Sequence, residues 1–322
     1  MIVVNTPGDW AHVYAPLLHS EWNGFTPTDL VFPLFLFIVG VSIALAPASD
    51  AGTILMRALR LVALGLALHA LAWWLLDRAA FRPWGVLQRI GICYAAAALL
   101  ATRSAARTQW ITIGTLLVGY WALMALGGSF ERDGNLASRV DTALLGRFNY
   151  EYDPKTGVGH DPEGLLSTFP AIATTLIGVR AGDWLRTRDP RRILAAGLGA
   201  LAIGGGWSLA FPINKNLWSS SFVLWAAGWS LLLLAAFHVA IDRRGLPPIG
   251  RRFGVNAIAI YAGAWVFECV PAIAGASRHI AAMFARASMD PKAVSLGYAL
   301  AFLLFWWMVA LYLDKQQVRI RI

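Results

Sequence analysis

Residues 30–48, with the sequence LVFPLFLFIVGVSIALAPA, form an apolar run without a charged side chain. A helix needs about 20 mostly apolar residues to cross the roughly 30 Å of hydrocarbon in a bilayer, so this run predicts a transmembrane helix. Eight further runs predict spans for the same reason. The nine predicted spans are residues 30–48, 55–76, 84–101, 110–127, 164–182, 193–211, 219–241, 255–274 and 294–313.

The overall composition points to the same class of protein. Hydrophobic residues make up 58% of the 322 residues, charged residues make up 14%, and the mean hydropathy is +0.58. Soluble domains are about one quarter charged, so an ordinary soluble enzyme, a disordered chain and a fibrous protein are all excluded. Lipid permits only helices or closed barrels, and runs of this length predict an all-α integral membrane protein. We expect one multispan domain over residues 1–322.

The chain begins with an apolar stub, Met1 to Val4, which is far too short to span a membrane. No basic segment precedes it, so it does not read as a signal peptide. It has the character of the last turn of a helix that starts earlier. This predicts a bundle of about ten transmembrane helices, nine complete spans plus the stub. Either the start codon lies further upstream, or the chain begins outside.

The basic residues are placed as in an oriented membrane protein. The net charge of +9 could indicate a nucleic acid partner. These residues lie in short connections between apolar runs, however, so we expect a lipid bilayer and no nucleic acid. Arginine concentrates in alternate connections, such as 180–192 and 242–252, which predicts that these and the C-terminus are cytoplasmic. The predicted outward cap consists of residues 6–29, 128–163, 212–218 and 275–293.

Polar residues gather in the outward segment 5–29, NTPGDWAHVYAPLLHSEWNGFTPTD, directly before the uncharged helix. Within it, Thr26 to Asp29 has the pattern of a capping box with proline at the first helical position. Asp29 therefore has a structural interpretation and a functional one, and the two can coexist. His19 is a candidate general base, because neutral imidazole accepts a proton near pH 7. It could instead be an interfacial hydrogen-bonding residue.

Two further outward patches are rich in polar groups. His160-Asp161-Pro162-Glu163-Gly164 precedes the span 164–182, and Glu163 is placed to cap its first turn. The loop 212–218, PINKNLW, combines side-chain amides, a lysine and an aromatic ring, which is the chemistry that binds sugars. Trp218 could equally be an interfacial belt residue.

Polar residues inside the predicted spans need partners. Gln88 and Arg89 lie within the span 84–101. A buried arginine requires a carboxylate, a water-filled cavity or an anionic ligand, so Arg89 predicts a phosphate-bearing ligand or an ion pair with Asp29 or Glu268. Asn256 begins another span and could be a cap. The sequence contains no P-loop, HExxH or paired CxxC motif, and we expect no metal.

Seven stretches together resemble one known family. In chain order they read VNTPGDW, HSEWNGFTPTDLVFPLFLFIVGVSI, WGVLQRIGICY, HDPEGLLST, AGDWL, PINKNLWSSSFV and GVNAIAIY. The second stretch is long and highly specific, and the short ones are strong in combination. By these stretches, which cover nearly the whole chain, it resembles the heparan-α-glucosaminide N-acetyltransferase family and its bacterial inner-membrane relatives of the NagX type.

The resemblance implies an enzyme that acetylates the amine of a terminal glucosamine outside the cytosol, with acetyl-CoA supplied from the cytosolic side. It also implies a bacterial inner membrane with the His19 side periplasmic, and a homodimer. The family's histidine, in a His-x-x-Trp-x-Gly stretch, falls on His19, its aspartate on Asp29 and its asparagine after the first helix on Asn5. A complete, basic first helix and the large lumenal domain of the animal enzyme have no counterpart here. The expected acceptor is therefore a small amino sugar or short oligosaccharide.

In the expected mechanism His19 takes the amine proton, Asp29 orients the imidazole and Asn5 donates to the oxyanion. An acetyl-histidine intermediate is the alternative chemistry. The expected substrate-binding residues are Trp22, Asn23, Asp161, Glu163, Asn214, Lys215, Asn216 and Trp218. The expected acetyl-CoA-binding residues are Gln88, Arg89, Asn256 and Tyr261. Two rival functions stay open: a permease for amino sugars or their oligosaccharides, and an O-acyltransferase that acts on envelope polysaccharide.

Overall fold

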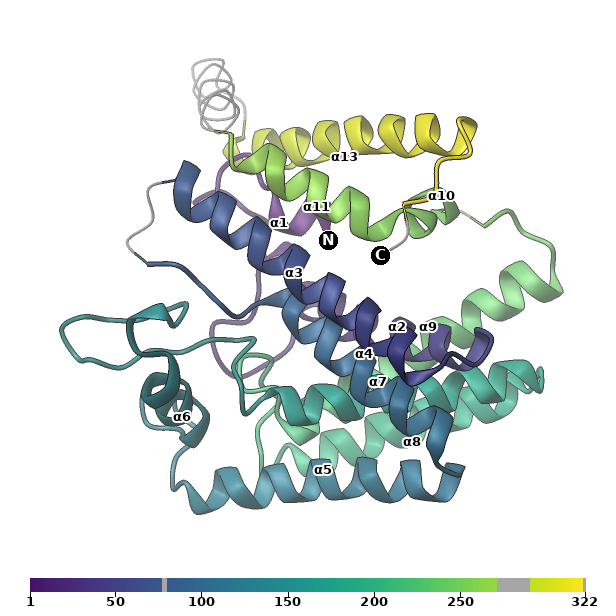
Figure 1. The fold of residues 1–322 in the computed structure, drawn as a ribbon, viewed down its shortest axis with the longest axis horizontal. Helices are drawn as coiled ribbons and strands as arrows, with labels where there is room; N and C mark the ends of the chain where they lie inside the picture. Colours follow the sequence, from purple (N-terminus) through teal and green to yellow (C-terminus); the bar gives the residue numbers. More distant parts are fainter. Residues whose placement is uncertain (77–79, 249, 271–289, 321–322) are drawn as a thin grey trace.

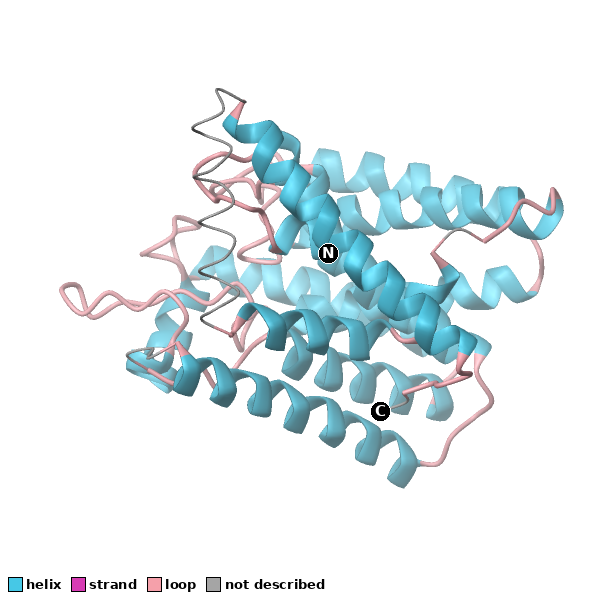
Figure 2. Ribbon diagram, turned by 90° about the horizontal axis from the view of Figure 1, so that it is seen from above, coloured by secondary structure: helices cyan, strands magenta, loops and turns pink. Residues whose placement is uncertain are grey.

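The computed structural model describes residues 1–76, 80–248, 250–270 and 290–320. Over these residues the secondary structure is helical, apart from one isolated bridge between Asp153 and Val158 (Figures 1 and 2). The α-helices are α1 (Ile2–Asn5), α2 (Val31–Leu45), α3 (Ala51–Leu75), α4 (Val86–Arg103), α5 (Ala106–Leu126), α6 (Leu136–Leu145), α7 (Thr168–Arg186), α8 (Pro190–Trp207), α9 (Ser220–Phe237), α10 (Arg251–Val255), α11 (Ala257–Glu268) and α13 (Pro291–Lys315). The short 3₁₀ turns are η1 (Ala15–Leu17), η2 (Pro27–Leu30) and η3 (Gly146–Phe148), and η4 (His238–Arg243) is a π-helical extension of α9.

Helices begin where the sequence supplies a cap. The side chains of Asp50, Asn135 and Ser219 each accept a hydrogen bond from a backbone N–H in the first turn of the following helix. These bonds satisfy donors that would otherwise lack a partner at a helix start. Pro190 and Pro291 stand in the first helical position, where a missing N–H costs nothing.

The largest hydrophobic core lies in a bundle formed by α2 to α5 and α7 to α9. Its centre is the contact of α2 with α7, which run parallel, since Phe37 and Gly40 lie at Gly178 and Val41 and Ala44 lie at Gly182. The pairs α3–α4 and α8–α9 pack on either side. The two central helices touch backbone to backbone. A Cβ atom at Gly40 would lie 1.9 Å from the Thr175 carbonyl oxygen, and one at Gly178 would lie 2.0 Å from that of Phe37. Glycine is required at both positions because no other residue fits this approach.

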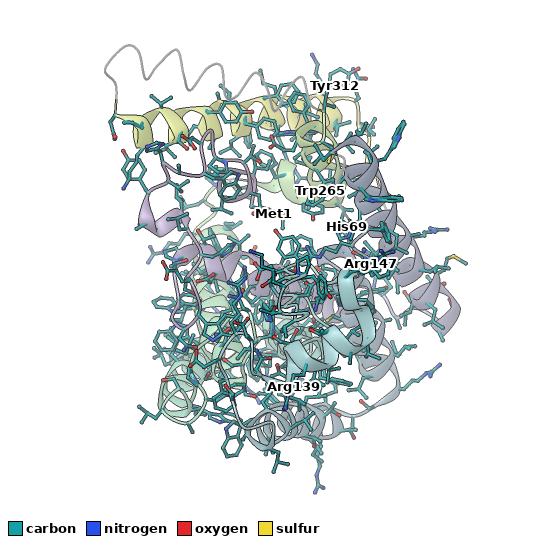
Figure 3. All side chains as sticks on the ribbon, turned by 90° about the vertical axis from the view of Figure 1, so that its left-hand side faces the viewer. Met1, His69, Arg139, Arg147, Trp265 and Tyr312 are labelled. Carbon is teal, nitrogen blue, oxygen red and sulfur yellow. The ribbon has the colours of Figure 1, made fainter. Side chains whose placement is uncertain are left out.

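A second, smaller group contains α1, α10, α11 and α13, with Ile260, Phe302 and Trp306 in its core. It meets the main bundle where α11 lies along α3. There the indole N–H of Trp265 donates to the Leu68 carbonyl at 3.4 Å, and the ring lies 5.7 Å from that of His69. Figure 3 shows His69 and Trp265 at this junction, seen from the end of the bundle that carries α6.

The predicted class is confirmed in its coarse form, an all-helical chain with membrane-spanning helices. Over the described residues, five helices are long and apolar enough to cross a membrane: Pro27–Leu45, Ala51–Leu75, Ala106–Leu126, Ser220–Arg243 and Pro291–Lys315. They match five of the nine predicted spans. The runs 84–101, 164–182 and 193–211 form helices α4, α7 and α8, each of which includes arginine residues that lower its hydropathy. The run 255–274 forms the short helix α11, and its last four residues lie outside the described residues.

The connections between helices gather at two opposite ends (Figure 1). The short connections α2–α3, α4–α5, α7–α8 and α9–α10 lie at one end, on the right of the figure. The segment around α6, which is the predicted outward cap 128–163, lies at the other end. Residues 275–289 of the fourth predicted outward segment lie outside the described residues. The predicted capping box is present, although Thr26 opens the 3₁₀ turn η2 rather than α2 itself.

Candidate functional site

His19 and Asp29 form a histidine–carboxylate pair at the N-terminal end of α2. Nδ1 of His19 lies 2.7 Å from Oδ1 of Asp29. The aspartate side chain has no exposed surface, whereas 46% of the histidine side chain is exposed. A carboxylate beside one ring nitrogen fixes the proton on that nitrogen and leaves the other as an acceptor. The pair therefore presents Nε2 as a base on an accessible side chain.

The backbone around Asp29 holds its carboxylate in place. Oδ2 accepts hydrogen bonds from the backbone N–H of Thr26 at 2.9 Å and of Ser20 at 3.2 Å, and from the Thr26 hydroxyl at 3.2 Å. The first of these is the capping interaction expected from the sequence. The same side chain thus caps η2 through one oxygen and contacts His19 through the other. The structural interpretation of Asp29 is confirmed, and its geometry leaves room for the catalytic one.

Lys215 reaches His19 from the loop 212–219. Its Nζ lies 3.3 Å from both ring nitrogens of His19. The loop is joined to the His19 segment by a hydrogen bond from the Asn214 side-chain amide to Oδ1 of Asn23 at 3.1 Å. A second bond runs from the Gly24 N–H to the Ile213 carbonyl at 2.8 Å. Residues of the predicted site that lie far apart in the sequence, such as His19 and Lys215, are therefore in contact here.

The other predicted sugar-contacting residues differ in accessibility. The indole N–H of Trp22 donates to the Phe130 carbonyl at 3.0 Å, and its ring packs edge-on against His160 at 5.1 Å. Asn216 is half-buried on the lysine loop. Trp218 has no exposed surface and packs against Phe32 in the bundle core. Its ring face is not available as a sugar platform in this structure, and it is not a belt residue at the lipid interface.

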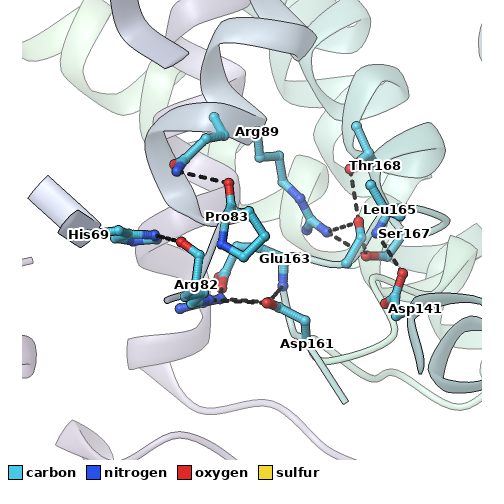
Figure 4. Close-up of polar contacts among 12 residues, drawn as sticks. His69, Arg82, Pro83, Arg89, Asp141, Asp161, Glu163, Leu165, Ser167 and Thr168 are labelled. Atoms are coloured by element: carbon cyan, nitrogen blue, oxygen red, sulfur yellow. Dashed lines mark hydrogen bonds and ion pairs between the residues drawn. The ribbon is translucent and has the colours of Figure 1, made fainter. Parts of the chain in front are cut away.

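An ion-pair cluster joins Arg82 to the carboxylates of Asp161 and Glu163 (Figure 4). Arg82 contacts Asp161 through Nε at 3.0 Å and through Nη2 at 2.5 Å, and Nη2 also reaches Glu163 at 2.6 Å. The guanidinium lies over the Tyr150 ring at 4.1 Å. The Arg82 side chain is 16% exposed, and both carboxylates are buried. This cluster holds the segment 158–168 against the chain that leads into α4.

Arg82 was not among the sequence-predicted residues. It lies in Phe81-Arg82-Pro83-Trp84, just ahead of a predicted span, where a basic residue reads as an ordinary flanking charge. Only the fold shows that Asp161 and Glu163 are its partners. The expectation that Glu163 caps the first turn of the following span is wrong, because α7 begins at Thr168 and Glu163 turns toward Arg82. Burial opposes ionisation of Glu163, but the charges of Arg82, Arg89 and Lys215 outweigh it and lower its pKa.

Arg89 is fully enclosed between α4 and the start of α7. Its Nη2 donates to the Gly164 carbonyl at 2.9 Å and to the Ser167 hydroxyl, and its guanidinium lies 5.1 Å from the Trp218 ring (Figure 4). Within the described parts of the chain, neither Asp29 nor Glu268 pairs with it. Nε and Nη1 have no hydrogen-bond partner. The expected ion pair is therefore absent there, and Arg89 has no surface open to a ligand in this structure.

Of the remaining residues expected to bind acetyl-CoA, Gln88 and Tyr261 line one narrow pocket, which has no room for a water molecule in this structure. Its other lining residues are Gly65, Leu68, His69, Leu87 and Trp265. The Gln88 amide oxygen has no hydrogen-bond partner. Asn256 lies elsewhere. Its amide donates to the Val318 carbonyl at 3.1 Å and accepts from the Ile320 N–H at 2.9 Å, so it fastens the C-terminal segment rather than capping α11 with its side chain.

Asn5 ends the single helical turn α1, which packs against α13. Its side chain is exposed. The chain after it is bound to α13 by hydrogen bonds from the Gly8 N–H to the Ser295 carbonyl and from the Asp9 N–H to the Ser295 hydroxyl. The described contacts therefore place Asn5 with the α13 group and give it no bond to His19. Lys215, and not Asn5, is the polar residue that the structure brings to His19.

Two buried groups near the cap were also missed. Asp141 on α6 accepts the Leu165 N–H at 2.8 Å through Oδ1, whereas Oδ2 has no partner and lies against Gly164. Burial, reinforced by the charge of Asp161, raises the pKa of Asp141 to about 6. Burial also lowers the pKa of His160, which contacts the Ser138 hydroxyl, to about 4. A sequence reading shows the residue types but not this enclosure.

We expect Asp141 to make the protein less stable as the pH rises. Its pKa is about 6 in the folded state and near 4 when unfolded, so the folded state binds the proton more tightly and loses stability as the pH rises through this window. A shift of about two pKa units corresponds to about 3 kcal/mol. Thermal unfolding in detergent at a series of pH values should therefore show a decline that is absent in Asp141→Asn. The exposed Asp133→Asn is the matched control, and an equal decline in all three proteins would contradict the assignment.

Among the described residues there is no group of three or more His, Cys, Asp or Glu side chains that could hold a metal ion.

Comparisons with known proteins extend the picture. The family model described as "Heparan-alpha-glucosaminide N-acetyltransferase, catalytic" matches residues 1–212. The heparan-alpha-glucosaminide N-acetyltransferase of Homo sapiens is 31% identical over 350 residues, which cover 83% of this chain and 51% of the relative. The Mus musculus protein of the same name is 29% identical over 346 residues, with the same coverage. The chain thus spans about half the length of the curated relatives it matches.

Proposed function

The chain belongs to the heparan-alpha-glucosaminide N-acetyltransferase family, and from this premise we propose that it is a membrane N-acetyltransferase. It moves an acetyl group from acetyl-CoA to the amine of a glucosamine-type sugar, a small amino sugar or a short oligosaccharide. The observation that carries the proposal is the His19–Asp29 pair. It is a tautomer-fixed base on an accessible side chain, next to a lysine and to the amide-rich segments around Asn23 and Asn214.

The chemistry assigned to this chain is proton transfer and charge stabilisation. The sugar amine hydrogen-bonds to Nε2 of His19 and attacks the acyl carbon of the thioester. The new C–N bond forms while the carbonyl electron pair moves onto oxygen, and Nε2 takes the amine proton. Asp29 holds Nδ1–H and stabilises the imidazolium that results. When the carbonyl re-forms, the C–S bond breaks and the sulfur leaves as CoA thiolate. Asn23, which is exposed, offers its amide group to the sugar hydroxyls, and the buried Asn214 holds Asn23 in place through the bond to its Oδ1.

The donor must be held by other parts of the chain. The pocket lined by Gln88 and Tyr261 is too narrow in this structure to hold a water molecule, so its side chains must move apart before a narrow portion of a donor can enter. The unpaired amide oxygen of Gln88 suits an amide N–H, a group that acetyl-CoA carries. We propose Gln88 and Tyr261 as donor contacts. Arg89 is enclosed, and we propose that it holds the segment 164–167 in place through its bonds to Gly164 and Ser167.

We also propose the membrane arrangement expected from the sequence. The chain contributes to a bundle of about ten transmembrane helices in a bacterial inner membrane. The C-terminus and the arginine-rich connections are cytoplasmic, and His19 faces the periplasm. This orientation follows the distribution of arginine, and the grouping of these connections at one end of the bundle supports it. A homodimer is the proposed assembly.

The proposal is tested with purified protein in nanodiscs, supplied with acetyl-CoA and either glucosamine or glucose. CoA release and the acetylated product are followed together. We expect release only with the amine, and N-acetylglucosamine as the product. Release with both sugars would favour an O-acyltransferase, and binding of the sugar without any release of CoA would overturn acetyl transfer altogether.

A further inference from the structure

Lys215 is a cation held against the base. Its Nζ is equally distant, 3.3 Å, from the two ring nitrogens of His19. A point at this range from both nitrogens lies over the ring face, because an in-plane position would collide with the C–H between them. The ammonium therefore does not occupy the in-plane lone pair of Nε2. That lone pair stays available to a substrate while the positive charge stands beside it.

The loop 212–219, which carries Lys215, is held in its conformation by hydrogen bonds within the loop. Asn214 accepts the Leu217 N–H at 2.8 Å and donates its own backbone N–H to the Ser219 hydroxyl at 3.1 Å, and the Trp218 N–H donates to the Lys215 carbonyl at 3.0 Å. Trp218 adopts a φ of 51°, a left-handed conformation that is uncommon for a bulky residue. Such backbone persists only where the surroundings fix it, here by burial of the whole indole ring.

The charges around Lys215 come from several elements. Asp29 and Glu163 supply negative charge, and Arg89 supplies positive charge. Burial is the largest influence, and it lowers the pKa of Lys215 although the two carboxylates oppose it. Asp29 is bound to His19 and the backbone, and Glu163 to Arg82. No carboxylate lies within ion-pair distance of Lys215 in the described residues. The N–H groups of its ammonium are therefore available to donate hydrogen bonds to a substrate.

We propose that Lys215 is a catalytic residue of the acetyl transfer, whose ammonium binds the oxygen of the acyl group as negative charge develops on it. An amine hydrogen-bonded to Nε2 lies about 2.9 Å from that nitrogen, and the acyl oxygen lies two bonds beyond the amine. Nζ lies 3.3 Å from the same nitrogen, so it is close enough to donate a hydrogen bond to that oxygen. Lys215 gives up no proton in the step, because it donates a hydrogen bond while His19 takes the proton. This inference rests on the proposed function and gives Lys215 the role expected of Asn5.

The role predicts which kinetic constant changes. An interaction made only in the transition state lowers kcat when it is removed, whereas a sugar contact made equally in both states raises KM. Removal of one donor to an oxyanion typically costs about 100- to 1,000-fold in kcat. We therefore expect Lys215→Met to lower kcat about 100-fold and to leave KM for the amine within a few-fold. Lys155→Met, on the exposed hairpin of the same cap, is the matched control and should retain the wild-type kcat.

A chemical restoration separates the charge from the fold. Lys215→Cys should lose activity like Lys215→Met, and treatment with 2-bromoethylamine should restore it at least tenfold by placing an ammonium on the new thiol. Both native cysteines, Cys93 and Cys269, are buried, so the introduced thiol is the accessible one. The same protein is compared before and after alkylation, which makes the result independent of how the substitution affects folding. In addition, kcat should fall at alkaline pH as Lys215 loses its proton. Because arginine keeps its proton to higher pH than lysine, this fall should shift to higher pH in Lys215→Arg.

The outcomes distinguish this inference from the proposed function. A raised KM with unchanged kcat in Lys215→Met, or no restoration after alkylation of Lys215→Cys, would overturn the catalytic role of Lys215 while wild-type transfer stands. A wild-type rate in Lys215→Met would do the same. Absence of transfer by the wild-type protein, or full activity in His19→Ala, would overturn both.

Discussion

Replacement of His19 by alanine is expected to lower kcat/KM for acetyl transfer by about 100- to 10,000-fold, the range that a positioned general base contributes. The loss follows from removal of Nε2, the atom assigned to take the amine proton. The alternative chemistry, through an acetyl-histidine, requires the same atom and predicts the same loss. The rate is measured as CoA release with glucosamine in nanodiscs.

The folded structure should survive this substitution. Asp29 would lose one partner, but its carboxylate would still accept the Thr26 and Ser20 backbone N–H groups and the Thr26 hydroxyl. His19 itself is half-exposed, so alanine leaves no core cavity. The melting temperature in detergent should therefore change little, which separates a chemical defect from an unfolded protein.

His12 provides the matched control. It lies in the same segment 5–29 and forms the same kind of pair, with Nδ1 2.7 Å from Asp9. Among the described residues, however, no lysine is hydrogen-bonded to its ring. We expect His12→Ala to retain activity within a few-fold of wild type. Equal losses in the two variants, or near-normal turnover in His19→Ala, would show that the His19 pair is not the base.

Replacement of Arg82 by methionine is expected to destabilise the cap segment 128–163 strongly. Methionine fills similar space but leaves Asp161 and Glu163 as buried carboxylates without their cation. Removal of one partner of a buried ion pair typically costs about 3–5 kcal/mol. The segment 158–168 and the start of α7 should loosen together. The measurement is thermal unfolding in detergent, followed by tryptophan fluorescence.

The control is an exposed pair in the same cap. Arg132 pairs with Glu151, and more than a third of each side chain is exposed. Exposed pairs contribute about 0–1 kcal/mol, so Arg132→Met should scarcely lower the melting temperature. A small and equal change of the melting temperature in the two variants would contradict this prediction. It would mean that the Arg82 cluster is solvated and does not stabilise the segment 158–168.

Local sequence was sufficient for some features of this molecule. The uncharged run 30–48 predicts a membrane helix, and over Pro27–Leu45 the described chain forms a helix that is long and apolar enough to cross a membrane. The pattern from Thr26 to Asp29 predicts a capping box, and it is present. These features depend on hydropathy and on hydrogen bonds between residues close in the chain. They therefore need no knowledge of the tertiary fold.

Other features depend on contacts between distant segments, which no local pattern encodes. Nothing in the sequence around Arg82 indicates a buried ion pair, because its partners lie about 80 residues further along. Trp218 read as a sugar platform or belt residue because its burial is set by α2, which carries Phe32. The resemblance predicts that Asn5 donates to the oxyanion, whereas the described fold packs α1 against α13. The sequence predicts Lys215 as a sugar contact, but only the folded loop shows that its Nζ lies over the His19 ring.

The central claim is that acetyl groups pass from a thioester to an amine at His19. The most direct measurement uses sealed proteoliposomes with glucosamine trapped inside and acetyl-labelled CoA outside, followed by analysis of the trapped sugar. We predict labelled N-acetylglucosamine inside vesicles that carry the wild-type protein in the orientation that supplies CoA to the cytoplasmic face. Vesicles that carry His19→Ala should contain none. Unlabelled glucosamine that leaves the vesicles through the wild-type protein, without any acetylated product, would contradict the account and identify a permease.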